Sequence, residues 1–268
     1  MSPVKAIKTF RDLLAFLTII PMGGKEDFVF TSAEHLYLFP LIGGFIGLLG
    51  AVYFVGSGFI VQFLLGLVNL VVSLPTGFLV KLAPAAMTVA FLLVLTGLQH
   101  FDGLIDLGNA VGLRNVHDRK MVAHAWTVTY SGAVLALIVE FIAFAGLFFV
   151  NPVFAFGAVI AAEVSAKLAM VTIVWVGKPT HKGLGSIFLK KAKKKLNIVA
   201  YVLSVLIVYP FLGFTGIGVV LVSIPVAFVM EKVAEGVFGG VSGDVIGATN
   251  EVARAVTLVV LAGVLMVL

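Results

Sequence analysis

An all-α fold is predicted for this sequence: a polytopic integral membrane bundle of about seven transmembrane helices, with one further helix lying in the membrane interface at the N-terminus. Composition is the first observation behind this prediction. Of the 268 residues, 61% are hydrophobic and 12% are charged, whereas about a quarter are charged in soluble proteins. The second observation is that Lys and Arg cluster between alternate apolar stretches. Together these features exclude a water-soluble globular protein.

The N-terminal segment predicts the interfacial helix. Lys5, Lys8 and Arg11 precede a short apolar run at 13–22. The run lacks the small-residue cleavage site of a signal peptide. Basic residues beside a short apolar face are typical of an amphipathic helix that lies in the interface.

Seven apolar stretches predict the spans, because a spanning helix needs about 20 mostly apolar residues. They are roughly 36–56, 78–98, 128–150, 153–176, 197–213, 215–231 and 253–268. Residues 59–74 are apolar too, but they lie between Gly58 and Pro75, and we interpret them as a re-entrant or interfacial helix. An eighth span is the competing interpretation.

The distribution of basic residues predicts the orientation. With the N-terminus inside and seven crossings, only Lys81 lies near an outer end and Lys167 within a span, while the other 16 of 18 basic residues fall on or beside the cytoplasmic side. Lys and Arg in short loops mark that side, and an eighth span would destroy the asymmetry. We therefore expect a multi-pass protein of the cell membrane with its active site on the cytoplasmic face. The cytoplasmic segments are 1–35, 99–127, 177–196 and 232–252.

The chain shows no internal repeat or low-complexity linker, so residues 1–268 are treated as a single membrane domain. Glycines are clustered in the first span, where they suit close helix packing. They are Gly43, Gly44, Gly47 and Gly50.

Several chemistries are excluded by what the sequence lacks. It contains no cysteine, which excludes disulfides, zinc–thiolate and iron–sulfur sites and a thiol nucleophile. It also has no G-x-x-x-x-G-K-[ST], H-E-x-x-H or G-x-S-x-G motif, so a P-loop, a zincin site and a nucleophile elbow have no support. Any metal must use oxygen or nitrogen ligands.

The densest polar cluster follows the second span. Asp102, Asp106 and Asn109 occur at i, i+4 and i+7, so a helix would project all three from one face. Two carboxylates on one helical face repel each other unless a cation lies between them, and oxygen ligands suit Mg²⁺. A solvated helix end with acids capping it is the alternative.

Two glycine-rich turns are candidate phosphate sites, because flexible backbone can direct amide groups toward an anion. The turn before the last span leads to Asp244, which shares a helical face with Glu251. The second turn precedes a run of lysines that is typical of contact with anionic lipid. The candidate binding residues are His181, Gly183, Gly185, Ser186, Gly239, Gly240, Ser242, Gly243 and Glu251.

Other polar residues receive smaller roles. Glu163 and Lys167 have the i, i+4 spacing of an ion pair within the fourth span, which predicts a supporting role. Glu140 has no charged residue four positions away. Four histidines do not have the spacing of a metal cluster and are left out of catalysis. They are His35, His100, His117 and His124.

At these same clusters the chain resembles the cobalamin synthase family. The family's opening phrases are similar to 16–21 and 39–43, and its H-L-D-G-L-A-D-x-x-D-G signature is matched at 100–106. Its G-L-G-N-V-F segment is similar to 183–188, and its G-G-x-T-G-D-x-x-G-A-x-x-E segment to 239–251. Order and spacing agree along most of the chain. Two positions depart: Asn109 replaces the third acid, and 125–127 reads Ala-Trp-Thr where Arg-Asp-Ser is expected, so Asp118 is an alternative ligand.

The resemblance implies a transferase that joins adenosylcobinamide-GDP to α-ribazole or its 5′-phosphate and releases GMP. Mg²⁺ is the implied cofactor, held by Asp102 and Asp106 with Asn109 and Asp244, and Asp244 is alternatively the base. The expected partners are these substrates and the lipid bilayer, without nucleic acid, and a homo-oligomer is possible. A CDP-alcohol phosphotransferase is the nearest rival, although the Ala-Arg pair of its signature is missing after Asp102-Gly103. A small-molecule transporter is the rival from another class.

Overall fold

The computed structural model describes residues 3–22, 28–73, 75–113, 115, 118–119, 122, 127–192 and 194–267. Within these ranges all regular elements are helices, apart from one isolated β-bridge between Pro179 and Val241. The predicted all-α class is therefore confirmed.

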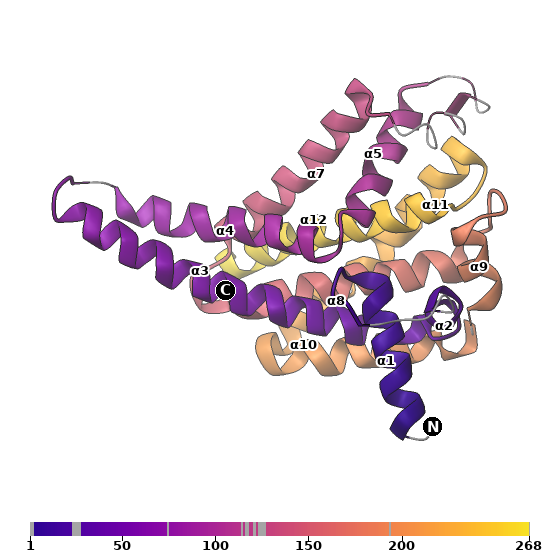
Figure 1. Cartoon of the computed structure of the whole chain (residues 1–268), viewed down its shortest axis with the longest axis horizontal. Coiled ribbons are helices and arrows are strands. Elements are labelled where there is room, and N and C mark those ends of the chain that lie inside the picture. The colour runs from indigo at the N-terminus through magenta and orange to yellow at the C-terminus, as the bar shows by residue number, and fades with distance from the viewer. Residues whose placement is uncertain are drawn as a thin grey trace.

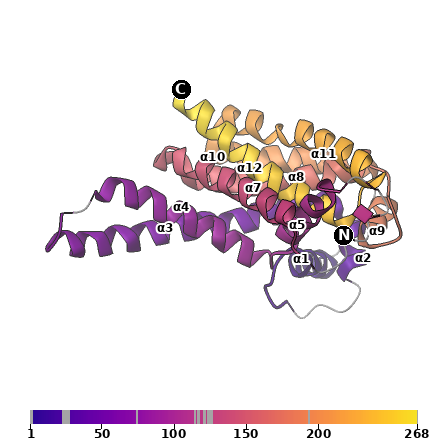
Figure 2. The same cartoon turned by 90° about the horizontal axis from the view of Figure 1, so that it is seen from above.

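The helices pack into one bundle from which the pair α3 and α4 projects, as both views show (Figures 1 and 2). In chain order they are α1 Pro3–Leu17, α2 Phe28–Glu34, η1 Leu36–Leu38, α3 Phe39–Asn69, α4 Thr76–Leu95, α5 Gln99–Val111, α7 Tyr130–Phe149, α8 Pro152–Val176, α9 Leu184–Lys191, η2 Lys194–Leu196, α10 Asn197–Val220, α11 Ser223–Phe238 and α12 Gly243–Val267.

Six helical stretches of the described chain are long and apolar enough to cross a membrane. One of them, Asn197–Phe238, has 42 residues, but Gly213 interrupts it with non-helical backbone at φ 55° and ψ −143°. A Cβ atom on Gly216 would lie 2.6 Å from Val208 and 2.7 Å from Leu212, so the chain folds back at Gly213. This break agrees with the turn predicted near residue 214 and divides the stretch into two arms, which gives seven in all.

The interpretation of residues 59–74 as a re-entrant or interfacial helix is wrong. Helix α3 runs without a break for 31 residues, from Phe39 to Asn69. Gly58 does not end it, because an isolated glycine weakens a helix by only about 1 kcal/mol, and an apolar solvent favours backbone that stays hydrogen-bonded. At 1.5 Å per residue such a helix is about 46 Å long, and its far end extends beyond the bundle with the start of α4 (Figure 1).

Helix α8 forms the centre of the bundle, where α3, α10, α11 and α12 contact it. Two glycines allow α3 to approach it closely. A Cβ atom on Gly43 would lie 2.6 Å from the carbonyl oxygen of Glu163, and one on Gly47 would lie 2.7 Å from the Cα of Ile160. The predicted role of the glycine cluster in helix packing is confirmed at these two positions.

The described parts of the four segments predicted to share one side of the membrane lie at one end of the bundle. This end carries α1 and α2, the start of α5, α9 and the junction of α11 with α12 (Figure 1). The predicted N-terminal helix is present as α1, whose Leu13, Leu14 and Leu17 are buried against the bundle. We call this end the polar end.

Candidate active site

The starts of α5 and α12 build the rim on which the predicted acids lie. After α4 the chain turns sharply, because Gly97 and Leu98 adopt left-handed backbone with φ 67° and 59°. Helix α5 then begins at Gln99. Gly103 packs on the backbone of Asp244, where a Cβ atom would collide with the carbonyl oxygen. The missing side chain at Gly103 thus brings α5 against the first turn of α12.

Asp102, Asp106 and Asp244 gather at this acidic rim. Asp102 is exposed, whereas Asp106 and Asp244 are half-buried. Burial, followed by the negative charges of Asp244 and Asp102, raises the pKa of Asp106 to about 7. The charge of Asp244, on α12, therefore acts on Asp106, on α5.

The donor set of the acidic rim fits Mg²⁺. This ion takes carboxylate oxygens, and it usually binds one or two of them together with waters and substrate phosphates. A divalent cation would also relieve the repulsion that raises the pKa of Asp106. Among the residues that the structure describes, no three acidic or histidine side chains converge on one metal position. A metal at the rim would therefore need further ligands, such as waters or substrate phosphates.

Asn109, expected as a further ligand, is occupied elsewhere. Its Oδ1 accepts hydrogen bonds from the backbone N–H of Thr129 at 2.9 Å and from Thr129 Oγ1 at 2.7 Å. Its Nδ2 donates to the carbonyl oxygen of Thr127 at 2.8 Å. The amide is 1% exposed. Asn109 thus joins the end of α5 to the start of α7, and we leave it out of the proposed metal ligands.

The two glycine-rich turns predicted separately meet at the polar end. Val241 N donates to the carbonyl oxygen of Lys178 at 2.7 Å, and Thr180 N donates to that of Val241 at 3.3 Å. Gly239 and Gly240 permit this approach, with φ 74° and 154°. A Cβ atom on Gly240 would lie 2.7 Å from the carbonyl oxygen of Lys178.

Both predicted serines cap helices beside these turns. Ser186 Oγ donates to the carbonyl oxygen of Gly183 at 2.8 Å and accepts from Gly183 N at 3.1 Å. Ser242 Oγ accepts from Val245 N at 3.3 Å and donates to Asp244 Oδ2 at 3.3 Å. Capping satisfies backbone groups at each helix start, so both hydroxyls already have partners within the protein.

The remaining candidates of the turn at 181–186 lie beside the turn at 239–243. A Cβ atom on Gly185 would be 2.6 Å from Gly243 N, so α9 packs against the start of α12. His181 is exposed, and a Cβ atom on Gly183 would be 3.2 Å from its Nε2. The turns therefore form one continuous backbone surface next to Asp244.

A cavity of about 190 Å³ opens beside the acidic rim. The rings of Phe16, Phe39 and Phe188 line one side, and Gln99, His100 and the first turn of α12, with Asp244, line others. The three rings pack on one another, with centroids 5.1 Å apart for Phe16 and Phe188, and 5.9 Å apart for Phe39 and Phe188. We call this cavity the aromatic pocket.

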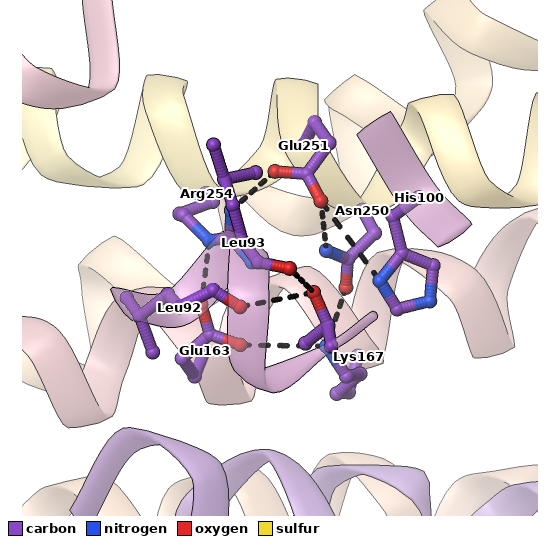
Figure 3. Close-up of polar contacts among 9 residues, drawn as sticks. Leu92, Leu93, His100, Glu163, Lys167, Asn250, Glu251 and Arg254 are labelled. Carbon is purple, nitrogen blue, oxygen red and sulfur yellow. Dashed lines mark hydrogen bonds and ion pairs between the residues drawn. The ribbon is translucent and has the colours of Figure 1, made fainter. Parts of the chain in front are cut away.

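Below the rim, a buried ion network joins α8 to α12 (Figure 3). Lys167 Nζ lies 3.4 Å from Glu163 Oε2 and donates to Asn250 Oδ1 at 2.7 Å. Arg254 pairs with both Glu163 and Glu251. The predicted pair of Glu163 and Lys167 is confirmed. The two acids and two bases are all at most 1% exposed, and a third acid, Glu140 of α7, acts on Glu251 and Arg254.

Glu251, expected to bind substrate, belongs to this network. Its Oε2 accepts from Arg254 and its Oε1 accepts from Asn250 Nδ2 at 3.1 Å. His100 Nδ1 lies 3.8 Å from Glu251 Oε1. Burial, and then the positive charges of Lys167 and Arg254, holds the pKa of His100 well below its usual value. His100 is therefore neutral at pH 7 and connects the network to the aromatic pocket.

Arg254 and the environment of His100 were missed by sequence reasoning. Arg254 was counted beside the cytoplasmic side, but it is fully buried within α12. Its i, i+3 spacing from Glu251 was the available signal. Some candidates lie outside the described residues. They are His117, His124 and most of the departing segment 125–127.

The family model for cobalamin-5-phosphate synthase matches residues 9–262. Three curated relatives, each named adenosylcobinamide-GDP ribazoletransferase, are similar over nearly the whole chain. That of Methanosarcina barkeri is 29% identical, covering 94% of this chain and 91% of the relative. That of Methanocella arvoryzae is 29% identical, covering 95% of each. That of Halorubrum lacusprofundi is 32% identical, covering 94% and 95%. No solved structure matches the chain.

Proposed function

The chain belongs to the cobalamin-5-phosphate synthase family and acts as an adenosylcobinamide-GDP ribazoletransferase, and we propose that the acidic rim is its active site. Membership makes the protein a transferase of cobalamin biosynthesis, and its helices make it a multi-pass membrane protein. The single observation that carries the assignment of the site is that Asp102 and Asp244, from α5 and α12, both lie close enough to Asp106 for their charges to act on it.

The reaction joins adenosylcobinamide-GDP to α-ribazole or its 5′-phosphate. A ribose hydroxyl oxygen of the acceptor bonds to the phosphorus attached to cobinamide, and the bond from that phosphorus to the bridging oxygen breaks. GMP leaves with the bridging oxygen, and the hydroxyl proton is lost. Such phosphoryl transfers depend mainly on positioning and charge stabilisation, so the site must hold a diphosphate against an acceptor.

The acidic rim supplies the ligands for that task. Bound Mg²⁺ would neutralise the diphosphate and the charge that develops on the leaving phosphate. Asp102 and Asp106 would hold the ion, and Asp244 would act beside them as a further ligand or, alternatively, as the group that accepts the hydroxyl proton. Burial, followed by the charges of Asp244 and Asp102, raises the pKa of Asp106, and a bound cation would offset the repulsion between these acids.

The joined glycine turns hold phosphate oxygens beside the rim. Gly185 packs on Gly243, the neighbour of Asp244, and Gly240 packs on the backbone of 178–180, while Gly183 and Gly239 belong to the same two turns. His181 is exposed at the edge of this surface. Because both serine hydroxyls serve as helix caps, backbone amides are the main donors, while Glu251 stabilises the structure from below.

The polar end faces the cytoplasm of the cell membrane. This orientation rests on the Lys and Arg bias of its four segments. It would place the acidic rim where soluble nucleotide substrates arrive.

Purified, detergent-solubilised protein tests the proposal. It is incubated with adenosylcobinamide-GDP, α-ribazole phosphate and either MgCl₂ or EDTA, and GMP and the corrinoid product are measured by mass. We expect both products with MgCl₂ and neither with EDTA. Asp102→Ala should abolish Mg²⁺-dependent turnover while the protein stays folded, and Glu235→Ala, which removes an exposed acid of α11, should not. Full activity of Asp102→Ala would refute the site, and substrate uptake by proteoliposomes without GMP release would favour a transporter.

A further inference from the structure

The aromatic pocket is a built cavity that the acidic rim does not explain. Its apolar side comes from three separate segments: Phe16 of α1, Phe39 of α3 and Phe188 of α9. Phe39 and Phe188 are 0% and 3% exposed, so their rings are held in place by the bundle. A cavity that distant segments build in common, directly beside a reaction site, is a candidate for a substrate subsite.

The size of the pocket limits what enters it. An engineered cavity of about 150 Å³ holds one benzene molecule, and this pocket measures about 190 Å³. It therefore accepts one planar system of about two fused rings. A corrin ring or a complete nucleotide is too large, so the bulk of each substrate has to remain outside.

The lining distinguishes between the two ring systems that the substrates offer. Guanine presents acceptors at O6 and N7 and a donor at N2, and burying such groups without partners is costly. The pocket is lined mostly by apolar residues, and its polar side chains are those of Gln99, His100 and Asp244. The benzimidazole base of α-ribazole is bonded to ribose through one nitrogen and keeps a single unsubstituted ring nitrogen. This largely apolar ring system suits a lining that is mostly apolar and has few polar side chains.

The position of the pocket supports the same choice. Asp244 lines the pocket and also belongs to the acidic rim, where its charge acts on Asp106. A base held in the pocket would leave its ribose at the mouth, beside Asp244. The acceptor hydroxyl is carried by that ribose, so this placement brings the attacking oxygen to the rim.

We propose that the aromatic pocket binds the benzimidazole base of α-ribazole and so determines which bases the enzyme accepts. This inference rests on the proposed function and adds the substrate that the pocket takes. The adenosylcobinamide-GDP donor then approaches the rim from outside, with its guanine elsewhere. Phe16, Phe39 and Phe188 act as specificity residues.

The first test substitution narrows the pocket and leaves the acids of the rim unchanged. Leu184 lines it and is 47% exposed, so Leu184→Trp can fill the pocket from its open side. We expect the KM for α-ribazole phosphate to rise roughly tenfold, with the KM for adenosylcobinamide-GDP unchanged. Leu196→Trp, at a residue 39% exposed outside the pocket lining, is the matched control and should alter neither value.

Enlarging the pocket should change the base preference of the enzyme, which would stay unchanged if the pocket residues had only a structural role. Ile246 lines the pocket, and Ile246→Ala removes contacts at its wall. The preference, measured as the ratio of kcat/KM values, should shift roughly fivefold toward a riboside phosphate whose base has a third fused ring. Ile160→Ala, at a buried isoleucine of α8 facing α3, should lower stability without shifting this preference.

Equilibrium dialysis measures binding of the acceptor separately from turnover, so failure of the pocket proposal can be told from failure of the proposed function. Wild-type protein should bind α-ribazole phosphate without the donor, and Leu184→Trp should weaken that binding. A selective rise in the KM for adenosylcobinamide-GDP would assign the pocket to guanine and overturn the inference, as would variants that change neither KM nor base preference. If wild-type protein releases no GMP at all, the proposed function fails instead.

Discussion

The acidic rim and the buried ion network are two charged regions a short distance apart that differ in nearly every respect. The network has two acids and two bases in contact, almost fully shielded from solvent. The rim has three acids, exposed or half-buried, and the pKa of Asp106 records their repulsion. Acids paired with bases in a buried site indicate a structural role, whereas a cluster of acids at an accessible surface offers a site for a cation. The comparison therefore predicts a structural role for the network and supports the proposal that the rim is the active site.

The largest effect should come from breaking the network. Arg254→Met leaves Glu163 and Glu251 buried with one partner fewer, and removing one member of a buried ion pair typically costs about 3–5 kcal/mol. Thermal unfolding in detergent should show a large loss of stability. Lys232→Met, which removes an exposed ion pair with Glu235, should cause no measurable loss. Equal stability of the two variants would contradict the structural role of the network.

Removing charge from the rim should instead affect activity. Asp244→Asn is expected to lower kcat about 10²–10³-fold, because it removes stabilisation of charge that develops in the transition state. The melting temperature should change little, since Asp244 is only half-buried. A variant that unfolds but keeps its kcat would reverse the assignment of the two regions.

The contact between α5 and α12 can be tested at Gly103. A Cβ atom there collides with the backbone of Asp244, so Gly103→Ala should push the two helices apart and reduce kcat/KM roughly tenfold through misplacement of the acids. Gly56→Ala is the control, because a Cβ atom on Gly56 meets nothing within 4 Å. Unchanged kcat/KM in Gly103→Ala would show that the spacing of the rim is not critical.

The smallest predicted effect concerns pH. The pKa of Asp106 in the folded protein is about 7, above the ordinary value of about 3.9, so between those values the folded state binds more protons than the unfolded state. Its contribution to stability is present at low pH and is lost as pH rises toward 7. In EDTA, the melting temperature should therefore be lower at pH 8 than at pH 5. The decrease should be smaller in Asp106→Asn, and Mg²⁺ at pH 8 should reverse it in the wild type; an identical decrease in both proteins would exclude Asp106 as its cause.

The rim was accessible to sequence reasoning because its evidence is local. Asp102 and Asp106 are four residues apart, and the bias of basic residues fixed the crossings well enough to place Asp244 at the same end. That the two glycine turns join, with Val241 bonded to Lys178, was not predictable, because the contact links segments more than 60 positions apart. Asn109 illustrates the same limit, since its partners at 127–129 are set by the packing of α5 on α7.

The network was predicted only in part, again for physical reasons. Glu163 and Lys167 lie one turn apart on one helix, whereas Arg254 reaches them from α12. In the sequence, Arg254 was placed at the cytoplasmic end of a helix, because the apolar run at 253–268 begins beside it. For residues 59–74 the sequence suggested helix boundaries at Gly58 and Pro75. Only Pro75 lies at a boundary, just before α4 begins at Thr76.

A double-mutant cycle at Asp102 and Asp244 tests the central claim most directly. The kcat/KM for GMP release is measured at saturating Mg²⁺ in wild type, Asp102→Asn, Asp244→Asn and the double variant. If both carboxylates serve one metal and one diphosphate, the double variant should lose little more activity than either single variant, because residues that act as a unit are not additive. Losses that multiply would mean that the two acids act independently, and the shared rim would not be the active site.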